Sequence, residues 1–395
     1  MKILMASHYF EAHRGGVEIA AGQLARALAR LGHRVTWAAC GCDPPPGDPA
    51  VCDRAVPLPA VNSLERRTGI PYPLPLPLAA ARFIDEVRSA DLVIVHDGSY
   101  VSSVLAHRTA QLVGVPIVLI QHIGLVPYRN PVLRLAMRVL THVVTRPALA
   151  AADQVVFISE LTRRHFATVR FRRAPLLVFN GIDTAVFRPP EPGSDRSAIR
   201  RSLGLHPERP MVLFVGRFVE KKGLRHLQRM AERRPDWSWV LAGWGPIDPT
   251  AWNLPNVHVV SGRSGAGLAA LYQATDALVL PSVGEGYPLV IQEALACGLP
   301  VVCGADTDTA TADPAAAPFL VGVHCCAADT TATGDRFIAA LAPFVAAPVS
   351  DTERRVRAEF ARTRYSWDEM ARRLIAHAPV SAVRQPSAPA LSPAI

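Results

Sequence analysis

Long apolar runs, lysine and patterned cysteines are all scarce in this chain of 395 residues. Half of the residues are hydrophobic, yet we find no run of about eighteen apolar positions, so we expect no integral membrane protein. The seven cysteines are odd in number and irregularly placed, which favours reduced thiols over a disulfide framework. Since no pair of them shows zinc-ligand spacing followed by a second pair, we predict no metal site.

The amino terminus also lacks the features of a targeting segment. Its apolar stretch, MKILMASHYF, is interrupted by Ser7 and His8 and is too short for a secretory signal. We therefore expect a cytoplasmic protein whose first residues form a buried strand.

Lysine occurs only at Lys2, Lys221 and Lys222, so nearly every other basic position is arginine. The net charge of +9 is unevenly distributed: between positions 120 and 175, nine arginines stand against two acidic residues, nine minus two giving +7.

Within this basic segment, Arg134, Arg138, His142 and Arg146 are spaced four apart on a predicted helix whose other side is apolar. Such a helix is either an ordinary surface helix or one that contacts an anionic membrane. Nucleic acid is a weaker interpretation, because aromatic residues are few and no recognition motif is present.

Short apolar runs alternate with longer stretches of helical period, which is typical of βαβ units and of parallel sheets buried on both faces. The first half contains predicted strands at 2–6, 34–39, 92–95, 116–120, 154–158 and 176–179. The alternation lapses at 181–210, which is rich in proline, glycine and charge, and it restarts with strands at 211–216, 237–243, 256–260, 276–282 and 299–304. The sequence therefore predicts an α/β protein of two Rossmann-like, doubly wound domains.

We place an N-terminal domain at 1–185 and a nucleotide-binding C-terminal domain from 186 to 364. Ligands bind at the carboxyl ends of the strands in such sheets, so we expect a nucleotide and a second substrate to meet in a central cleft. The proline-rich stretch 71–78 predicts an extended surface connection, and the tail 379–395, rich in proline and alanine, predicts disorder.

The most informative segment is GEGYPLVIQEALACGLPVV at 284–302. A predicted strand runs into it, and Pro288 stands at the first position of a predicted helix, whose free N–H groups and dipole form a site for a diphosphate. Glu293 lies about 7.5 Å further along the axis, within reach of the ribose attached to that diphosphate. Glu285 is costly beside a phosphate unless it has another role, such as accepting hydrogen bonds from sugar hydroxyls. Taken singly, each glutamate is better explained as a solvated charge, Glu285 on a loop and Glu293 on an exposed helix face.

The segment GRFVEKKG at 216–223 follows a predicted strand directly. Arg217 and Lys222 would then project from a strand-end loop, where they neutralise a diphosphate leaving group without a metal ion. An exposed turn is the alternative.

Two weaker signals lie in the first domain. Gly15 and Gly16 precede a predicted helix, where their backbone can approach a ligand, although a plain turn explains them equally well. His122 ends a buried strand, where a histidine is either a hydrogen-bonded core residue or a ligand contact.

Together these segments resemble family 4 of the retaining glycosyltransferases, which have the GT-B fold. Glu285 and Glu293 match its E-x7-E block, GRFVEKKG is similar to its G-R-x(4)-K-G element, and GGVE at 15–18 is similar to its first loop. The likeness spans the chain to about residue 378, where 365–378 is like the helix that crosses back to the first domain. The likeness fails at residues 303–318, where CGADTDTATADPAAAP replaces the family's usual loop. The identity of the donor sugar therefore stays open.

The resemblance implies transfer of a sugar from a nucleoside-diphosphate sugar to an acceptor hydroxyl, with no cofactor. It implies catalytic roles for four residues: Arg217, Lys222, Glu285 and His122. It implies donor binding by eight others: Gly15, Gly16, Gly216, Gly286, Tyr287, Pro288, Leu289 and Glu293. The acceptor, whether a glycan, a lipid-linked sugar or a small molecule, stays open. A nucleotide-sugar epimerase and a catalytically idle, sugar-nucleotide-binding relative are the alternatives.

Overall fold

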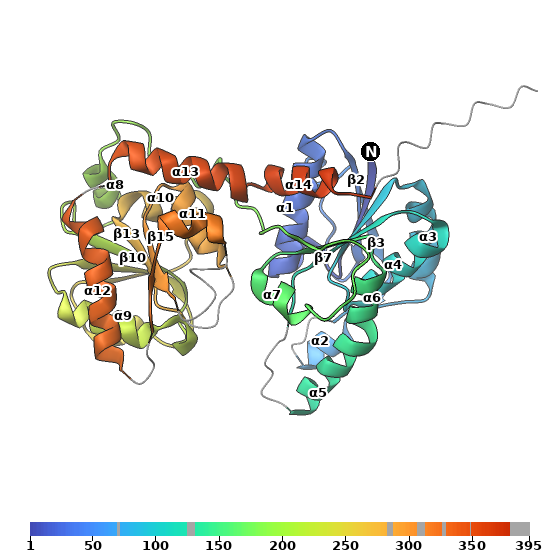
Figure 1. The fold of residues 1–395 in the computed structure, drawn as a ribbon, viewed down its shortest axis with the longest axis horizontal. Coiled ribbons are helices and arrows are strands. Elements are labelled where there is room, and N and C mark those ends of the chain that lie inside the picture. Colours follow the sequence, from blue (N-terminus) through green and yellow to red (C-terminus); the bar gives the residue numbers. More distant parts are fainter. Residues whose placement is uncertain are drawn as a thin grey trace, which may run out of the picture. The chain divides into compact units, whose positions relative to one another are not determined.

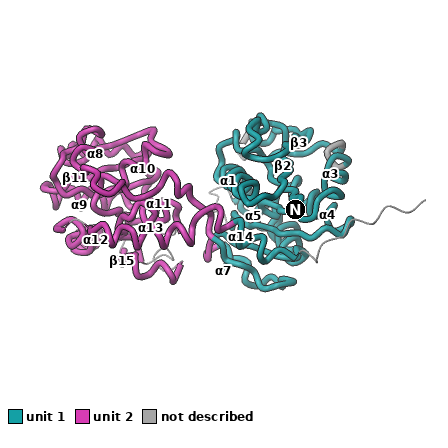
Figure 2. The backbone as a smooth tube through the Cα atoms, turned by 90° about the horizontal axis from the view of Figure 1, so that it is seen from above, with its two compact units in different colours: residues 1–158, 162–178, 371–395 teal, residues 159–161, 179–370 magenta. Residues whose placement is uncertain are grey.

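The computed structural model describes residues 1–68, 72–124, 131–282, 287–305, 313–325, 329–347 and 349–379. The chain forms two compact units (Figure 2). Unit 1 contains Met1–Ile158, Thr162–Val178 and the chain from Ala371 on, and unit 2 contains Ser159–Leu161 and Phe179–Met370.

Unit 1 is built on a parallel seven-stranded sheet with the order β3-β2-β1-β6-β7-β8-β9 (Figure 1). Its strands are β1 Lys2–Ala6, β2 Arg34–Cys40, β3 Arg54–Leu58, β6 Leu92–His96, β7 Ile117–Gln121, β8 Gln154–Phe157 and β9 Leu176–Leu177. The central strands β6, β7 and β8 are buried at every residue because helices cover both faces, so they appear in the sequence as continuous apolar runs.

Unit 2 is built on a parallel six-stranded sheet with the order β12-β11-β10-β13-β14-β15. Its strands are β10 Met211–Arg217, β11 Ser238–Trp244, β12 Val257–Val260, β13 Ala277–Leu280, β14 Val301–Gly304 and β15 Leu320–Val323. In chain order this is the 3-2-1-4-5-6 arrangement of a doubly wound sheet. The predicted α/β class with two doubly wound sheets is confirmed.

The helices up to residue 178 are α1 Gly16–Arg30, α2 Ser63–Thr68, α3 Leu78–Ser89, α4 Val101–Val113, α5 Pro131–Leu140, α6 Arg146–Ala151 and α7 Glu160–His165. A π-helical segment, Thr141–Thr145, joins α5 to α6. The later helices are α8 Arg196–Ser202, α9 Leu224–Arg233, α10 Gly265–Ala274, α11 Leu289–Ala296, α12 Thr330–Ala346, α13 Asp351–Tyr365 and α14 Trp367–Ala376. None of the described helices is long and apolar enough to cross a membrane.

Three local predictions need correction. The edge strands β3 and β15 were not predicted, because proline at position 57 and glycine at 322 interrupt their apolar pattern. Within 71–78, Leu74–Pro75 forms β5, which pairs antiparallel with β4, Ala60–Val61, and α3 already begins at Leu78. The π-helical segment interrupts the regular four-residue spacing of the predicted basic stripe. Arg146 is half-buried and donates a hydrogen bond to Thr168, so it does not continue the stripe that begins at Arg134.

The two units divide between Val178 and Phe179, ahead of the position expected from composition. Phe179 packs against the rings of Tyr287 and Tyr365, and a side chain at Gly181 would lie 2.6 Å from the Cα atom of Trp367. The segment that looked like a linker therefore belongs to the packing of unit 2.

Candidate donor and acceptor sites

Strand order reverses in unit 2 between the neighbouring strands β10 and β13. The chain leaves these strands in opposite directions at such a point, which opens a crevice at their carboxyl ends. Arg217 is the last residue of β10, and α11 begins shortly after β13. The sheet topology therefore places the predicted phosphate-binding residues on both sides of this switch point.

Lys222 folds back over the end of β10. A Cβ atom added at Gly216 would lie 3.7 Å from Cε of Lys222, so the alkyl part of the lysine covers this glycine. Lys222 ends the short 3-10 helix Glu220–Lys222 and is half-buried, whereas Lys221 beside it is exposed. The structure thus brings Gly216 and Lys222 together, and it gives the two lysines different environments, half-buried for Lys222 and exposed for Lys221.

Arg217 is exposed and lies with its guanidinium carbon 5.0 Å from the ring centre of Trp244, the last residue of β11. This cation–π contact orients the guanidinium along the carboxyl edge of the sheet. The indole of Trp244 is itself 65% exposed, so the pair presents both a cation and an aromatic face to a ligand.

Glycines make the close approach of these loops possible. Gly223 has φ +77, and a Cβ atom there would lie 2.2 Å from the carbonyl oxygen of Pro281, just after β13. A Cβ atom at Gly243 would lie 1.9 Å from the carbonyl oxygen of Gly216. Any side chain at either position would force the ends of β10, β11 and β13 apart.

Helix α11 begins at Leu289, and Pro288 is its N-cap in an extended conformation rather than its first helical residue. Among the described residues no side chain caps this end, and its first turn contains no acidic residue. The start of α11 therefore keeps its dipole and its first amide groups for an anion. Glu285 and Gly286, predicted on the loop before it, lie outside the described residues.

The side chain of Tyr287 supports the fold instead of lining an open site. Its hydroxyl lies 3.0 Å from the hydroxyl of Tyr365, which in turn donates to Asp313. Arg364 forms an ion pair with the same carboxylate. This network ties the start of α11 to the end of α13, so only the backbone of Tyr287 remains for a donor contact.

Glu293 accepts a hydrogen bond of 2.8 Å from the hydroxyl of Tyr272, a fully buried residue of α10. Burial raises the pKa of Glu293 to about 7, although the hydrogen bond from Tyr272 opposes this rise. The carboxyl group is therefore poised to change its charge near neutral pH. Tyr272 was not singled out from the sequence, since only the folded structure brings it to Glu293.

A buried hydroxyl at the same edge was also missed. Ser282 follows β13 and is 3% exposed, and its Oγ has no hydrogen-bond partner among the described residues.

In unit 1 the strand order reverses between β1 and β6. His8 follows β1, and its Nε2 lies 2.7 Å from Oε1 of Glu18 on the first turn of α1. Both side chains are buried, and the ring of His8 stacks on Tyr100 at 3.7 Å. Burial acts to raise the pKa of Glu18, but the hydrogen bond and charge of His8 outweigh it and lower that pKa.

The carboxylate of Glu18 folds back onto the start of α1. A Cβ atom at Gly15 would lie 2.1 Å from its Oε2, whereas nothing lies within 4 Å of one at Gly16. Gly15 is thus required for packing against Glu18, and Gly16 leaves open space at the helix start.

His122 follows β7 and lies 3.0 Å, Nε2 to Nδ1, from His96 at the end of β6. Burial lowers the pKa of His122 to about 3, so its imidazole is neutral. Asp97 accepts hydrogen bonds from the backbone of His122 and from the side chain of Gln121, while its Oδ2 has no partner among the described residues. Burial raises the pKa of Asp97 to about 7.

Asp97 also has φ +59, an unfavourable conformation for a residue other than glycine. His8, His96 and Asp97 were missed in the sequence, and Glu18 entered only as part of GGVE at 15–18. The signal for His96 and Asp97 was HDG directly after a predicted strand, where polar residues follow an apolar run.

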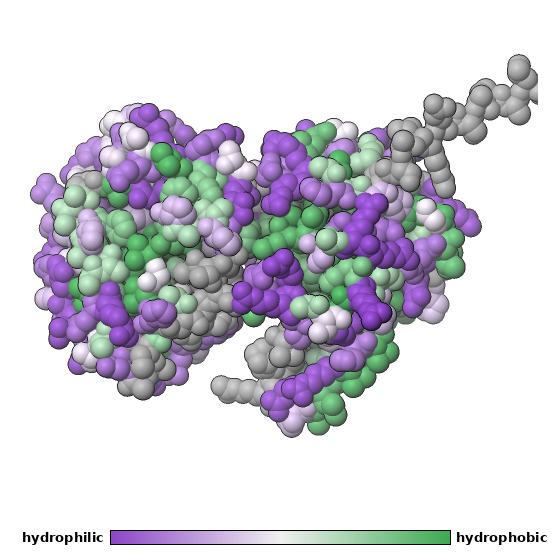
Figure 3. All heavy atoms as spheres, viewed as in Figure 1, coloured by the Kyte–Doolittle hydropathy of each residue, from purple (hydrophilic) through white to green (hydrophobic). Residues whose placement is uncertain are grey.

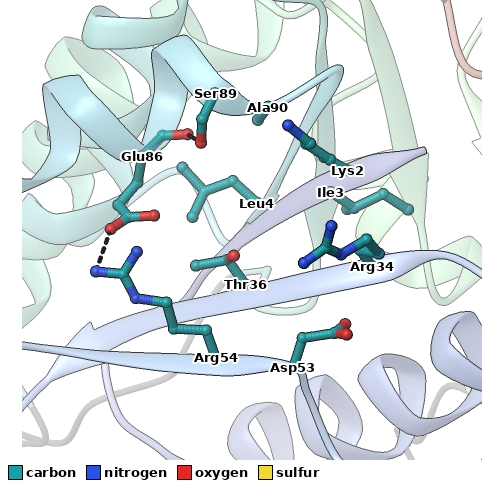
Figure 4. A pocket seen from close by; sticks show the side chains of 10 residues that line it. All are labelled: Lys2, Ile3, Leu4, Arg34, Thr36, Asp53, Arg54, Glu86, Ser89 and Ala90. Atoms are coloured by element: carbon teal, nitrogen blue, oxygen red, sulfur yellow. Dashed lines mark hydrogen bonds and ion pairs between the residues drawn. The ribbon is translucent and has the colours of Figure 1, made fainter.

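A pocket of about 310 Å³ lies at the opposite, amino-terminal edge of the unit 1 sheet (Figure 4). Lys2, Arg34 and Arg54 begin β1, β2 and β3 there, and Arg54 forms an ion pair with Glu86. None of the predicted site residues lines it. Among the described residues no group of three or more His, Cys, Asp or Glu could hold a metal ion.

Comparison with known proteins identifies the family to which this chain is similar. A family model for Glycosyltransferase Family 4 matches residues 14–186, and one for Glycosyl transferases group 1 matches residues 195–311. α-Maltose-1-phosphate synthase of Mycolicibacterium smegmatis is 32% identical over 277 residues, which cover 65% of this chain and 70% of that protein. The chain belongs to glycosyltransferase family 4.

Solved structures share the fold of this family 4 glycosyltransferase. Sucrose-phosphate synthase from Thermosynechococcus elongatus has a TM-score of 0.65 at 20% identity, covering 95% of this chain and 98% of its own. HepE of Anabaena in complex with UDP has a TM-score of 0.66 at 17% identity, covering 95% and 99%. HepE has also been solved with UDP-glucose. These neighbours confirm the predicted GT-B fold of two Rossmann-like domains.

Proposed function

We propose that this family 4 glycosyltransferase transfers a sugar from a nucleoside-diphosphate sugar to an acceptor hydroxyl with retention of anomeric configuration. The observation that carries the proposal is the convergence, at the switch point of unit 2, of Arg217, Lys222 and the uncapped start of α11. Each of these groups stabilises negative charge, and none of them requires a metal ion.

The chemistry of the step sets the demand on these residues. The bond between the anomeric carbon and the diphosphate oxygen breaks, the acceptor oxygen forms the new bond, and the acceptor proton leaves with the diphosphate. Charge develops on the departing diphosphate, so donors that are already in place lower the barrier. Arg217 and Lys222 supply that charge stabilisation, and the amides of Leu289 and its neighbours supply hydrogen bonds.

Glu293 is assigned to the ribose hydroxyls and Glu285 to the hydroxyls of the donor sugar. In unit 1, His122 is assigned to the donor sugar and the start of α1, with Gly15 and Gly16, to donor and acceptor contacts. A neutral imidazole both donates and accepts a hydrogen bond, which suits a sugar hydroxyl better than a cation does.

The acceptor is proposed to belong to cell-envelope polysaccharide, glycolipid or natural-product synthesis in the cytoplasm. Peripheral contact with the inner face of a membrane is supported by Arg134 and Arg138, which are exposed on α5. Arg146 contributes less, since it is half-buried against Thr168. The related synthases are named for phosphorylated products, so sugar phosphates belong among the acceptors to be tried.

The test is a panel of UDP-, GDP-, ADP- and TDP-sugars incubated with and without acceptors. Acceptor-dependent release of the nucleoside diphosphate, with an axial product linkage from an axial donor, is the expected outcome. A changed donor sugar without acceptor would indicate an epimerase instead. Thermal stabilisation without turnover for any acceptor would indicate a binding protein.

A further inference from the structure

Helix α5 lies at the surface of unit 1 along its whole length. It contains no buried residue, although its sequence, PVLRLAMRVL, is mostly apolar. In Figure 3 this helix stands out from the body of unit 1, with hydrophobic side chains along one side and hydrophilic ones along the other.

Two apolar stripes run along α5 and the π-helical segment. The inner stripe is half-buried: Leu133, Met137, Leu140 and Val144. The outer stripe, which we call the outer ridge, is exposed by 54% to 75%: Val132, Leu135, Val139 and Val143. Contact with unit 1 therefore uses only the inner half of the apolar surface.

Basic side chains flank the outer ridge. Arg134, Arg138 and His142 are exposed, and at about 100° per residue they lie on the side of the helix next to the ridge. From 131 to 152 the chain contains no acidic residue at all. Large exposed apolar side chains beside cations, in a segment without acidic residues, are the pattern of helices that lie in the interface of an anionic bilayer.

A pocket of about 250 Å³ continues the apolar surface at the end of the ridge, and it is lined by Val104, His107, Arg108, Val143, Val144 and Pro147, among others. His107 is 3% exposed, and neither of its ring nitrogens has a hydrogen-bond partner in the described part of the chain. Such a site offers a donor and an acceptor to a polar group that enters from the ridge.

We propose that the outer ridge inserts into the surface of a membrane that contains anionic lipids, with Arg134 and Arg138 contacting lipid phosphates. A second copy of the chain fits less well, because a two-fold contact along the ridge would bring the cations of both copies together, and the segment 131–152 supplies no acidic residue to compensate them. The inference rests on the proposed peripheral membrane contact and names the surface that makes it. Because vesicle binding requires neither donor nor acceptor, its failure is distinguishable from failure of the transfer reaction.

The test is co-flotation of the full chain with vesicles of 30% phosphatidylglycerol and 70% phosphatidylcholine, compared with pure phosphatidylcholine. We expect binding to the anionic vesicles that weakens, without vanishing, as salt screens the arginines. Replacing both Leu135 and Val139 by glutamine should weaken binding at least about tenfold, because two side chains lose their apolar burial. Reversing Arg134 and Arg138 to glutamate should weaken it at least about 30-fold, since each cation contributes about fivefold.

Matched controls lie on α13 in unit 2. Val356→Gln removes a valine that is 53% exposed, against 54% for Val139, and Arg355→Glu reverses an exposed arginine. Both should bind vesicles as the unmodified chain does. Failure of that chain to float with anionic vesicles, or equal binding by the ridge and control variants, would overturn the proposal. So would concentration-dependent dimerisation that the ridge variant abolishes, if no vesicle binding accompanies it.

Discussion

The pKa of Glu293 gives a quantitative prediction about donor binding. With a pKa of about 7, the carboxyl group of the half-buried Glu293 is about one-tenth ionised at pH 6 and about nine-tenths ionised at pH 8. If the carboxylate accepts hydrogen bonds from ribose hydroxyls, the affinity for the donor must follow the ionised fraction. We therefore expect the affinity for the nucleoside-diphosphate sugar to rise about tenfold between pH 6 and pH 8.

Tyr272→Phe moves this profile in a predictable direction. The variant removes the hydroxyl that donates to Glu293, and a hydrogen bond to a charged group contributes about 1.5–3 kcal/mol. That energy corresponds to roughly one to two pKa units, so the midpoint should move to about 8 or 9. At pH 7 the affinity should fall by about tenfold, and it should recover at higher pH.

Isothermal titration calorimetry with one nucleoside-diphosphate sugar from pH 6 to pH 9 measures this profile. Glu293→Gln should bind weakly with no pH dependence over this range. Asp97→Asn is the control for the second group with a pKa of about 7. Asp97 lies in unit 1, next to His122, so this variant can change the affinity but should keep the midpoint near pH 7. A flat profile in the unmodified protein, or one that survives Glu293→Gln, would refute the assignment of Glu293 to the ribose.

Three further predictions concern rate, packing and stability. Arg217→Ala should lower the steady-state transfer rate on the order of 100-fold, by analogy with removal of one preorganised donor, and near-normal turnover would contradict its role. Gly223→Ala should lower the free energy of unfolding, measured in urea, by at least about 2 kcal/mol, because φ is +77 and its Cβ would lie 2.2 Å from a carbonyl oxygen. Gly267→Ala in α10, whose Cβ meets no atom closer than 3.5 Å, should change it by no more than about 1 kcal/mol. Since burial raises the pKa of Asp97 to about 7, the native state holds its proton more tightly and stability from this group is lost as pH rises from about 4 to 7. Over that range the free energy of unfolding of the unmodified chain should fall on the order of 3 kcal/mol through this group, and Asp97→Asn should abolish this fall. If urea unfolding of the variant showed the same pH dependence as the unmodified chain, the prediction would be contradicted.

The sequence predicted the two sheets well because their central strands are buried on both faces. β6, for example, was predicted at 92–95 from an unbroken apolar run bounded by polar residues, and it forms at Leu92–His96. Edge strands were harder to predict. β3 contains Pro57, which an edge strand tolerates because proline has no N–H to donate and only one side of β3 faces a neighbouring strand of the described sheet.

Residues of the candidate site could be predicted only where they lie together in one short segment of the sequence. Arg217 and Lys222 are close in sequence, and both end up at the carboxyl edge of the unit 2 sheet. Partners that lie on different elements were not predictable: Tyr272 of α10 reaches Glu293 of α11, and His8, which follows β1, reaches Glu18 of α1. Such pairs depend on tertiary packing, for which a single sequence contains no local signal.

The basic helix α5 could also be predicted only in part from the sequence. Its spacing of four predicted one continuous stripe, but the π-helical segment takes Arg146 out of it and leaves Val143 exposed at the end of the ridge. The sequence predicted an amphipathic helix there, and only the structure shows that half of its apolar surface stays uncovered by the described residues.

The central claim is that the carboxyl edge of the unit 2 sheet stabilises a departing nucleoside diphosphate. The adjacent lysines allow the most direct test, since Lys222 lies over Gly216 at that edge whereas Lys221 is exposed beside it. We predict that acceptor-dependent release of the nucleoside diphosphate falls on the order of 100-fold in Lys222→Ala and is unchanged in Lys221→Ala. Equal rates in the two variants, or release that does not depend on the acceptor, would contradict the account.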